Sequence, residues 1–247
     1  MIRSGLADDF VLSPNIEPRR NGRPVDLLLL HYTGMASANA ARDRLCHPES
    51  GVSCHYLVDG QGLITQMVGE EMRAWHAGLS HWGGEADTNS RSIGIEIHNP
   101  GHTLGYAEFP AVQMRRVIDL CHDILSRHAI PPRLVLAHSD VAPGRKIDPG
   151  EKFDWRLLHR KGIGHWVEPA PFMEGPSLGP GEAGEAVMRL QAMLADYGYG
   201  IAVTGTYDHE TKTVVSAFQR HFRPARVDGI ADRSTMDTLD SLLMALP

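Results

Sequence analysis

The chain has 247 residues, of which 42% are hydrophobic and 22% charged, as is ordinary for a soluble globular protein. This length allows one sizeable core and a smaller partner domain. The formal net charge of −6 offers no basic face, so a nucleic-acid partner is not expected. No stretch approaches the roughly 20 apolar residues of a membrane span.

The cysteines and the N-terminus bear on the compartment. Cys46, Cys54 and Cys121 are odd in number in a long chain, so we expect reduced, partly buried thiols rather than a disulfide framework. The N-terminus lacks the apolar run of a secretory signal and carries acidic residues early. This favours a cytoplasmic location, with a periplasmic or exported one as the alternative.

The first predicted elements are strands with one helix between them. Residues 25–30 form a continuous apolar run typical of a buried strand. Ser37 is placed to cap a helix that runs to about residue 46. Residues 55–58 and 63–68 flank the turn sequence DGQG, which predicts a hairpin.

The following elements alternate between strand and helix. Residues 92–98 (SIGIEIH) place three isoleucines on one face and Glu96 on the other. Residues 110–128 carry an apolar stripe at helical spacing, and residues 134–137 form another apolar strand. Interleaved strands and helices predict an α/β fold with a mixed central sheet flanked by helices.

A stretch rich in proline and glycine, residues 168–184, predicts a linker between residues 1–167 and a second domain, 185–247. The second domain contains a helical pattern at 185–197 and an internal repeat. Gly205 and Asp208 precede one predicted helix, and Gly229 and Asp232 precede another, each Asp placed as a cap. We therefore expect a small all-α domain of three helices.

Two apolar strands each lead into a histidine, His31 and His138, and Asp148 follows in a loop rich in proline and glycine. Strand ends meet at the rim of a sheet, where ligands bind. Two imidazoles and one carboxylate form a known catalytic zinc set. A strand-end histidine can equally be a hydrogen-bonded structural residue, so the residues alone leave both interpretations open.

Two further residues fit hydrolytic chemistry around such a site. Glu96 lies on the strand face opposite the isoleucines and can act as a general base and acid beside a metal-bound water, or else be a solvated edge residue. Lys146 lies two residues before Asp148 and can stabilise an oxyanion, or else be an ordinary surface lysine.

Several segments together resemble the AmpD-type, or type 2, N-acetylmuramoyl-L-alanine amidases, which are similar in fold to phage amidases and animal peptidoglycan recognition proteins. The matching segments cover most of residues 25 to 155: LLLLHYT, VSCHYLVDGQGLITQMV, AWHAG, NSRSIGIEIHNPG, AHSD and PGRKIDPGEKFDW. The second domain resembles three-helix peptidoglycan-binding domains through VMRLQAMLADYG, GTYDHETKTVVSAFQRHF and VDGIADRSTMDTL.

The resemblance implies roles for eight residues and one cofactor. It implies hydrolysis of the amide bond between N-acetylmuramic acid and L-alanine, with peptidoglycan or muropeptide fragments as the partner. One catalytic zinc ion would be held by His31, His138 and Asp148, with Glu96 as the acid/base and Lys146 polarising the carbonyl. With these come three expected substrate contacts: Trp75, His76 and Asn99.

Two other functions compete with this one. A non-catalytic peptidoglycan receptor can share the fold, although the complete set of zinc and acid/base residues argues against it. A peptidase of the same fold that cuts within the stem peptide is the second alternative. The sequence sets no expectation for the oligomeric state.

Overall fold

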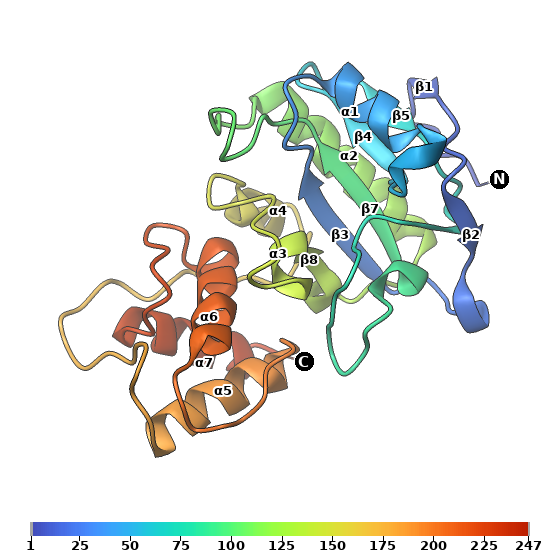
Figure 1. The fold of residues 1–247 in the computed structure, drawn as a ribbon. Coiled ribbons are helices and arrows are strands. Elements are labelled where there is room, and N and C mark those ends of the chain that lie inside the picture. Colours follow the sequence, from blue (N-terminus) through green and yellow to red (C-terminus); the bar gives the residue numbers. More distant parts are fainter. Residues whose placement is uncertain (1, 247) are drawn as a thin grey trace.

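The computed structural model describes residues 2–246, which form a mixed α/β domain followed by a helical one (Figure 1). The α/β domain contains a six-stranded sheet in the order β1-β5-β4-β7-β3-β8 and a two-stranded sheet of β2 and β6. The strands are β1 (Asp9–Phe10), β2 (Ile16–Pro18), β3 (Leu27–Tyr32), β4 (Tyr56–Val58), β5 (Ile64–Gln66), β6 (Met72–Ala74), β7 (Ser92–Ile97) and β8 (Val135–Ala137). The mixed sheet and the predicted β4–β5 hairpin are confirmed, since β8, β3, β7 and β4 are parallel and β5 is antiparallel to β4.

The centre of the sheet fixes which side chains share a face. Strand β3 lies between β7 and β8 and is fully buried at Leu27 to Leu30. In the β3–β7 register, His31 pairs with Glu96 and Leu29 with Gly94. Side chains alternate along a strand, so all four residues lie on one face, and the isoleucines of β7 lie on the other.

Helices cover both faces of this sheet (Figure 1). Helix α1 (Ala38–Leu45) begins at Ser37, whose hydroxyl accepts a hydrogen bond from the Ala40 N–H, as predicted. Helix α2 (Ala111–Arg127) buries the expected stripe, which includes Val117, Leu120, Cys121 and Ile124. Short helices α3 (His138–Val141) and α4 (Trp155–Arg160) follow β8, and 3-10 turns span Arg20–Gly22, Pro48–Ser50, Thr88–Arg91 and Pro132–Leu134.

The second domain has helices α5 (Glu185–Tyr197), α6 (His209–Phe222) and α7 (Arg233–Met244), as predicted. The internal repeat appears as two equivalent turns. Gly205 and Gly229 both have positive φ, and each donates its N–H to a buried glutamine, Gln191 or Gln219, at 2.8 Å. Asp208 and Asp232 cap the helices that follow. Within residues 2–246, none of the helices is both long and apolar enough to cross a bilayer.

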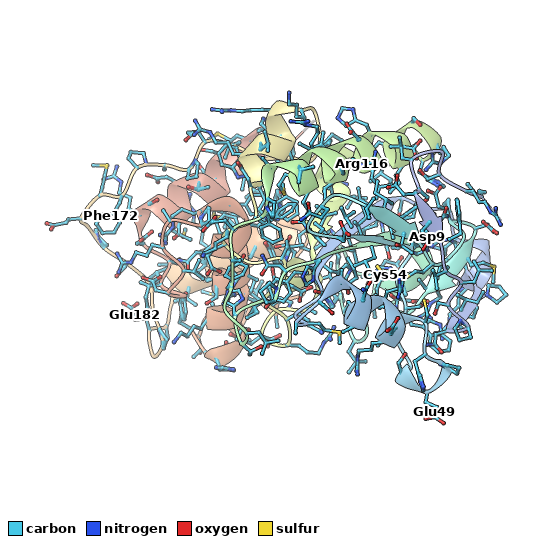
Figure 2. All side chains as sticks on the ribbon, turned by 90° about the horizontal axis from the view of Figure 1, so that it is seen from above. Asp9, Glu49, Cys54, Arg116, Phe172 and Glu182 are labelled. Carbon is cyan, nitrogen blue, oxygen red and sulfur yellow. The ribbon has the colours of Figure 1, made fainter. Side chains whose placement is uncertain are left out.

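The segment between the domains carries no helix or strand over 168–184, and Phe172 lies at the end of the molecule opposite the sheet (Figure 2). Two isolated bridges, Leu178 with Ala231 and Ala183 with Thr206, tie its second half to the helical domain. The predicted domain boundaries stay a prediction.

One feature differs from the sequence-based expectations. Strand β3 extends to Tyr32, so His31 lies inside the strand rather than beyond its end, because pairing with β7 continues through both residues. His138 follows β8 directly, as predicted, and begins the single helical turn α3. The three cysteines are free thiols, as expected.

Candidate metal centre

His31, His138 and Asp148 meet at one point although 107 residues separate the two histidines. Their closest atoms form a triangle: His31 Nδ1 to His138 Nδ1 is 2.8 Å, His138 Nδ1 to Asp148 Oδ2 is 3.0 Å, and His31 Nδ1 to Asp148 Oδ2 is 3.4 Å. Ligands on a tetrahedral zinc ion at ~2.0 Å stand roughly 3.3 Å apart. The triangle therefore has the size of three ligands around one small cation.

Hydrogen bonds on the far side of each ring aim the two Nδ1 atoms at this point. His138 Nε2 lies 3.1 Å from the Ala77 carbonyl oxygen, to which it can only donate. His31 Nε2 lies 3.0 Å from Nδ1 of His76, whose own Nε2 lies 3.2 Å from the Ser92 hydroxyl. If each Nε2–H donates in these contacts, the Nδ1 lone pairs of His31 and His138 stay free. This is the arrangement in which histidines bind metals.

The titration of the cluster also suits a cation. Burial, reinforced by neighbouring His138, lowers the pKa of His31 to about 4, so its imidazole is neutral at pH 7. Burial alone would raise the pKa of Asp148, but His138 and His31 outweigh it and hold that pKa well below its usual value. A neutral His31 imidazole and an ionised Asp148 carboxylate match the protonation states that metal binding requires.

Glu96 lies on the neighbouring strand, in register with His31. Burial, followed by the charge of Asp148, raises the pKa of Glu96 well above its usual value. Its Oε2 is buried and has no hydrogen-bond partner within residues 2–246. A carboxyl group with one buried, unpartnered oxygen beside the His31–His138–Asp148 cluster is suited to hold and return a proton, or to be stabilised by a nearby cation.

The cluster opens into a cleft of about 530 Å³. Six of the eight predicted site residues line it: Trp75, His76, Glu96, His138, Lys146 and Asp148. Trp75 Nε1 is buried without a hydrogen-bond partner in the described part of the chain, and Lys146 is half-buried with its charge near Glu96. The cleft therefore presents the Lys146 ammonium group beside the candidate metal centre, with the Trp75 indole in its wall.

Asn99 lies apart from the other predicted contacts. It is buried and lies outside the residues that line the cleft. Its amide group donates to the Ala107 carbonyl oxygen and accepts from the Gly101 N–H, so it holds the loop after β7 in shape. His76 both lines the cleft and lies within hydrogen-bond distance of His31.

Sequence reasoning missed Arg145, which precedes Lys146 and also lines the cleft. Its guanidinium donates to the carbonyl oxygens of Leu79 and Ala77. Ala77 is the residue whose carbonyl oxygen contacts His138, so Arg145 links the two loops around the centre. The sequence offered one indication that Arg145 belongs to the site, which is its position next to Lys146.

Comparisons with known proteins agree with this geometry. The family described as N-acetylmuramoyl-L-alanine amidase matches residues 21–151, and a family of peptidoglycan binding domains matches residues 183–239. The first match contains the four predicted metal and acid/base residues and Lys146, and the second contains most of the helical domain.

Individual relatives match over most of the chain. The N-acetylmuramoyl-L-alanine amidase AmiD of Escherichia coli is 36% identical over 234 residues, covering 89% of this chain and 82% of that protein. The 1,6-anhydro-N-acetylmuramyl-L-alanine amidase AmpD of Haemophilus influenzae is 31% identical over 174 residues, covering 62% of this chain and 92% of that protein.

Solved structures show the same fold across both domains. E. coli AmiD, in complex with the substrate anhydro-N-acetylmuramic acid-L-Ala-D-gamma-Glu-L-Lys, superposes with a TM-score of 0.77 at 34% identity and covers 92% of each chain. AmpDh3 of Pseudomonas aeruginosa gives a TM-score of 0.76 at 29% identity and covers 94% of this chain and 96% of that one.

Proposed function

The chain belongs to the N-acetylmuramoyl-L-alanine amidase family and carries a C-terminal peptidoglycan-binding domain, and from this premise we propose that it is a zinc-dependent enzyme whose metal is held by His31, His138 and Asp148. The amidase activity in peptidoglycan turnover follows from the family. The convergence of two imidazole Nδ1 atoms and one carboxylate oxygen within 4.8 Å supports the metal.

The donor set fits zinc rather than a harder cation. Two imidazole nitrogens with one carboxylate are typical of catalytic zinc, whereas magnesium and calcium prefer oxygen ligands alone. The unpartnered Glu96 Oε2 supports a cation at this point, because a nearby positive charge would offset the cost of its burial. When bound, zinc would lower the pKa of a water molecule and polarise a carbonyl group.

The remaining steps belong to the side chains of the cleft. Glu96 accepts the proton of the water that attacks the lactyl carbonyl carbon of N-acetylmuramic acid. The same carboxyl group then returns the proton to the amine of L-alanine, which makes this poor leaving group able to depart. The ammonium group of Lys146 stabilises the negative charge that develops on the carbonyl oxygen.

Substrate contacts are proposed for the other lining residues. Trp75 offers an indole face and an unpartnered N–H, which suit a sugar or an acetamido group. His76, on the cleft wall, is a proposed substrate contact, whereas the proposed role of Asn99 is to hold the loop after β7 in shape. Muropeptide fragments are the proposed ligands, by analogy with the substrate complex of the E. coli relative.

The decisive experiment measures metal content and products together. Purified protein should carry about one zinc ion per chain, and digestion of a soluble anhydro-muropeptide should free an intact stem peptide that begins with L-alanine. Removal of zinc by a chelator should abolish the reaction, and added zinc should restore it. Protein with no bound zinc and no released peptide would instead favour a non-catalytic receptor.

Mass spectrometry of the products also separates the peptidase alternative, because cleavage within the stem would leave L-alanine attached to the sugar. Running intact sacculi beside the soluble fragment shows which form of the substrate is preferred. Preference for sacculi would favour a location outside the cytoplasm, and preference for the fragment would favour recycling inside the cell.

A further inference from the structure

A buried carboxylate joins the two domains directly behind the candidate metal centre. Asp140 is fully buried. Its Oδ1 accepts a hydrogen bond from the Tyr199 hydroxyl at 2.8 Å, and its Oδ2 accepts one from His221 Nδ1 at 2.6 Å. Tyr199 follows α5 and His221 lies in α6, so both partners come from the C-terminal domain. Both are almost completely buried in the contact.

Asp140 belongs to the single turn that presents His138. Its Oδ2 also accepts the N–H of Ala137 at 2.8 Å, which caps α3 at the point where His138 begins. A helix of four residues has too few internal hydrogen bonds to be stable alone. The turn is therefore held from outside, through Asp140 and through the Ser139 N–H, which donates to the Asp148 carbonyl oxygen at 3.0 Å.

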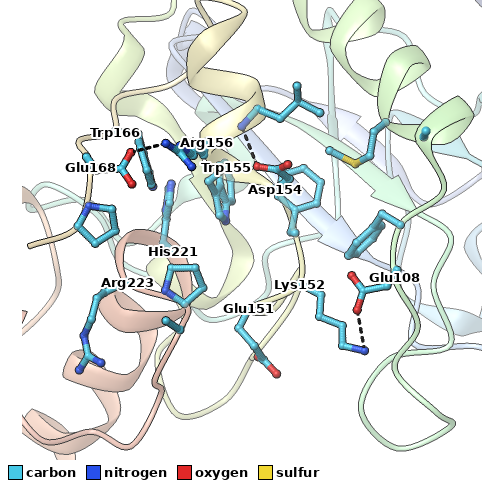
Figure 3. Close-up of a pocket in the computed structure, with 18 residues that line it drawn as sticks. Glu108, Glu151, Lys152, Asp154, Trp155, Arg156, Trp166, Glu168, His221 and Arg223 are labelled. Atoms are coloured by element: carbon cyan, nitrogen blue, oxygen red, sulfur yellow. Dashed lines mark hydrogen bonds and ion pairs between the residues drawn. The ribbon is translucent and has the colours of Figure 1, made fainter. Parts of the chain in front are cut away.

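The C-terminal domain also contacts the other loops around the centre. His221 stacks on Trp155, which follows the Asp148 loop, with ring centroids 3.7 Å apart (Figure 3). Tyr199 packs edge-on against Trp82, at 4.8 Å, on the loop that follows Ala77. One continuous buried core includes residues of both domains. The second domain thus packs against the α3 turn and against residues that follow the Asp148 and Ala77 loops.

We propose that the C-terminal domain is part of the metal centre's framework and that Tyr199 and His221 are positioning residues, which hold His138 in place through Asp140. This inference rests on the proposed zinc site. A domain that served only to hold the enzyme on the wall would need no buried polar contact behind a metal ligand. A buried carboxyl group is costly without hydrogen-bond partners, and two of the three donors to Asp140 come from the C-terminal domain.

The test uses full-length protein and three variants. The double variant Y199F/H221F removes both donors and keeps an aromatic ring at each position, so that a ring still lies against Trp155. H221N is the conservative variant, because its amide N–H can replace Nδ1–H. The matched control is Y207F, since the Tyr207 hydroxyl is equally buried in the same domain but donates to the Gly229 carbonyl oxygen, within that domain.

Zinc affinity is measured by chelator competition, and kcat and KM are measured on a soluble fragment that needs no wall attachment. Y199F/H221F should lose about 10-fold in zinc affinity and in kcat, the usual effect of removing an outer-shell contact, with KM nearly unchanged. H221N and Y207F should stay within about 3-fold of wild type. A folded double variant with wild-type zinc affinity and kcat would overturn the proposal.

Hydrogen exchange of residues 137–148 separates this inference from the proposed function. Exchange should rise in Y199F/H221F and stay unchanged in Y207F, even if wild type binds no zinc and the metal assignment fails. If the double variant does not fold, Y199F alone removes one donor and should show the same changes at smaller size. Unchanged exchange in every folded variant would refute the positioning role.

Discussion

Gly94→Ala offers a stringent test of the hydrogen-bond chain behind His31. Gly94 lies on β7 on the same face as Glu96. A Cβ at this position would stand 2.7 Å from Cγ and Nδ1 of His76 and 2.9 Å from Cys54 Sγ. The sheet backbone is held by its neighbours, so the imidazole of His76 has to move. That movement breaks its 3.0 Å contact with His31 Nε2.

The magnitude follows from two separate effects. Overpacking of a buried site costs about 1–3 kcal/mol of unfolding free energy. The gain from replacing glycine at an ordinary backbone conformation offsets about 0.4–1 kcal/mol of this. Loss of the outer hydrogen bond to a metal ligand lowers zinc affinity by about 10-fold, equivalent to about 1.4 kcal/mol.

A double-mutant cycle with His76→Ala isolates the mechanism, since alanine at position 76 removes the ring that the new methyl group displaces. Each single variant should lower zinc affinity about 10-fold, and the double variant should also lie near 10-fold, because both break the same contact. Zinc affinity by chelator competition and unfolding free energy by urea titration are the measurements. Gly60→Ala is the control, since its added Cβ meets nothing within 4 Å. Additive losses, near 100-fold in the double variant, would refute the reasoning.

Three further outcomes are expected. Glu96→Gln should lower kcat by about 10²- to 10⁴-fold while zinc affinity, measured by competition, stays within about 3-fold, because the carboxyl group transfers protons and is not a ligand. Asp148→Ala should lower zinc affinity at least about 100-fold by equilibrium dialysis, more than any outer contact; a smaller loss than Gly94→Ala would contradict its place in the ligand set. Burial raises the pKa of Glu70, but hydrogen bonds from His128, Arg127 and Tyr56 outweigh it and bring the pKa from 4.5 to about 2. Its carboxylate therefore stabilises the fold above pH 4.5, and up to about 3 kcal/mol should be lost as the pH falls towards 2. Urea titrations should show that loss in wild type and not in Glu70→Gln, and equal pH dependence in both would contradict it.

Much of the local structure could be predicted from the sequence. Strand alternation placed Glu96 on the face opposite the isoleucines, and Ser37, Asp208 and Asp232 cap the helices expected of them. These features depend on neighbours a few residues apart, whose periodicity and hydrogen-bonding capacity are written in the chain itself. The metal-ligand and acid/base candidates and Lys146 were assigned roles because the sequence motifs around them resemble those of a known family.

The geometry of the site depended on the tertiary structure. Residues alone did not decide between structural and metal-binding histidines, because the contact of His31 with His138 joins positions 107 residues apart through the pairing of β3 with β8. The hydrogen bond between His76 and His31 could not be predicted either, because it too joins segments that are distant in the sequence.

The sequence by itself determined the element types, the two-domain order and the donor residues. Only the tertiary structure decided that Tyr199 and His221 contact Asp140, and that the linker's second half pairs with the helical domain. Contacts between distant segments depend on how whole elements pack, and a linear pattern of polar and apolar residues records which faces are buried but not which surface covers them.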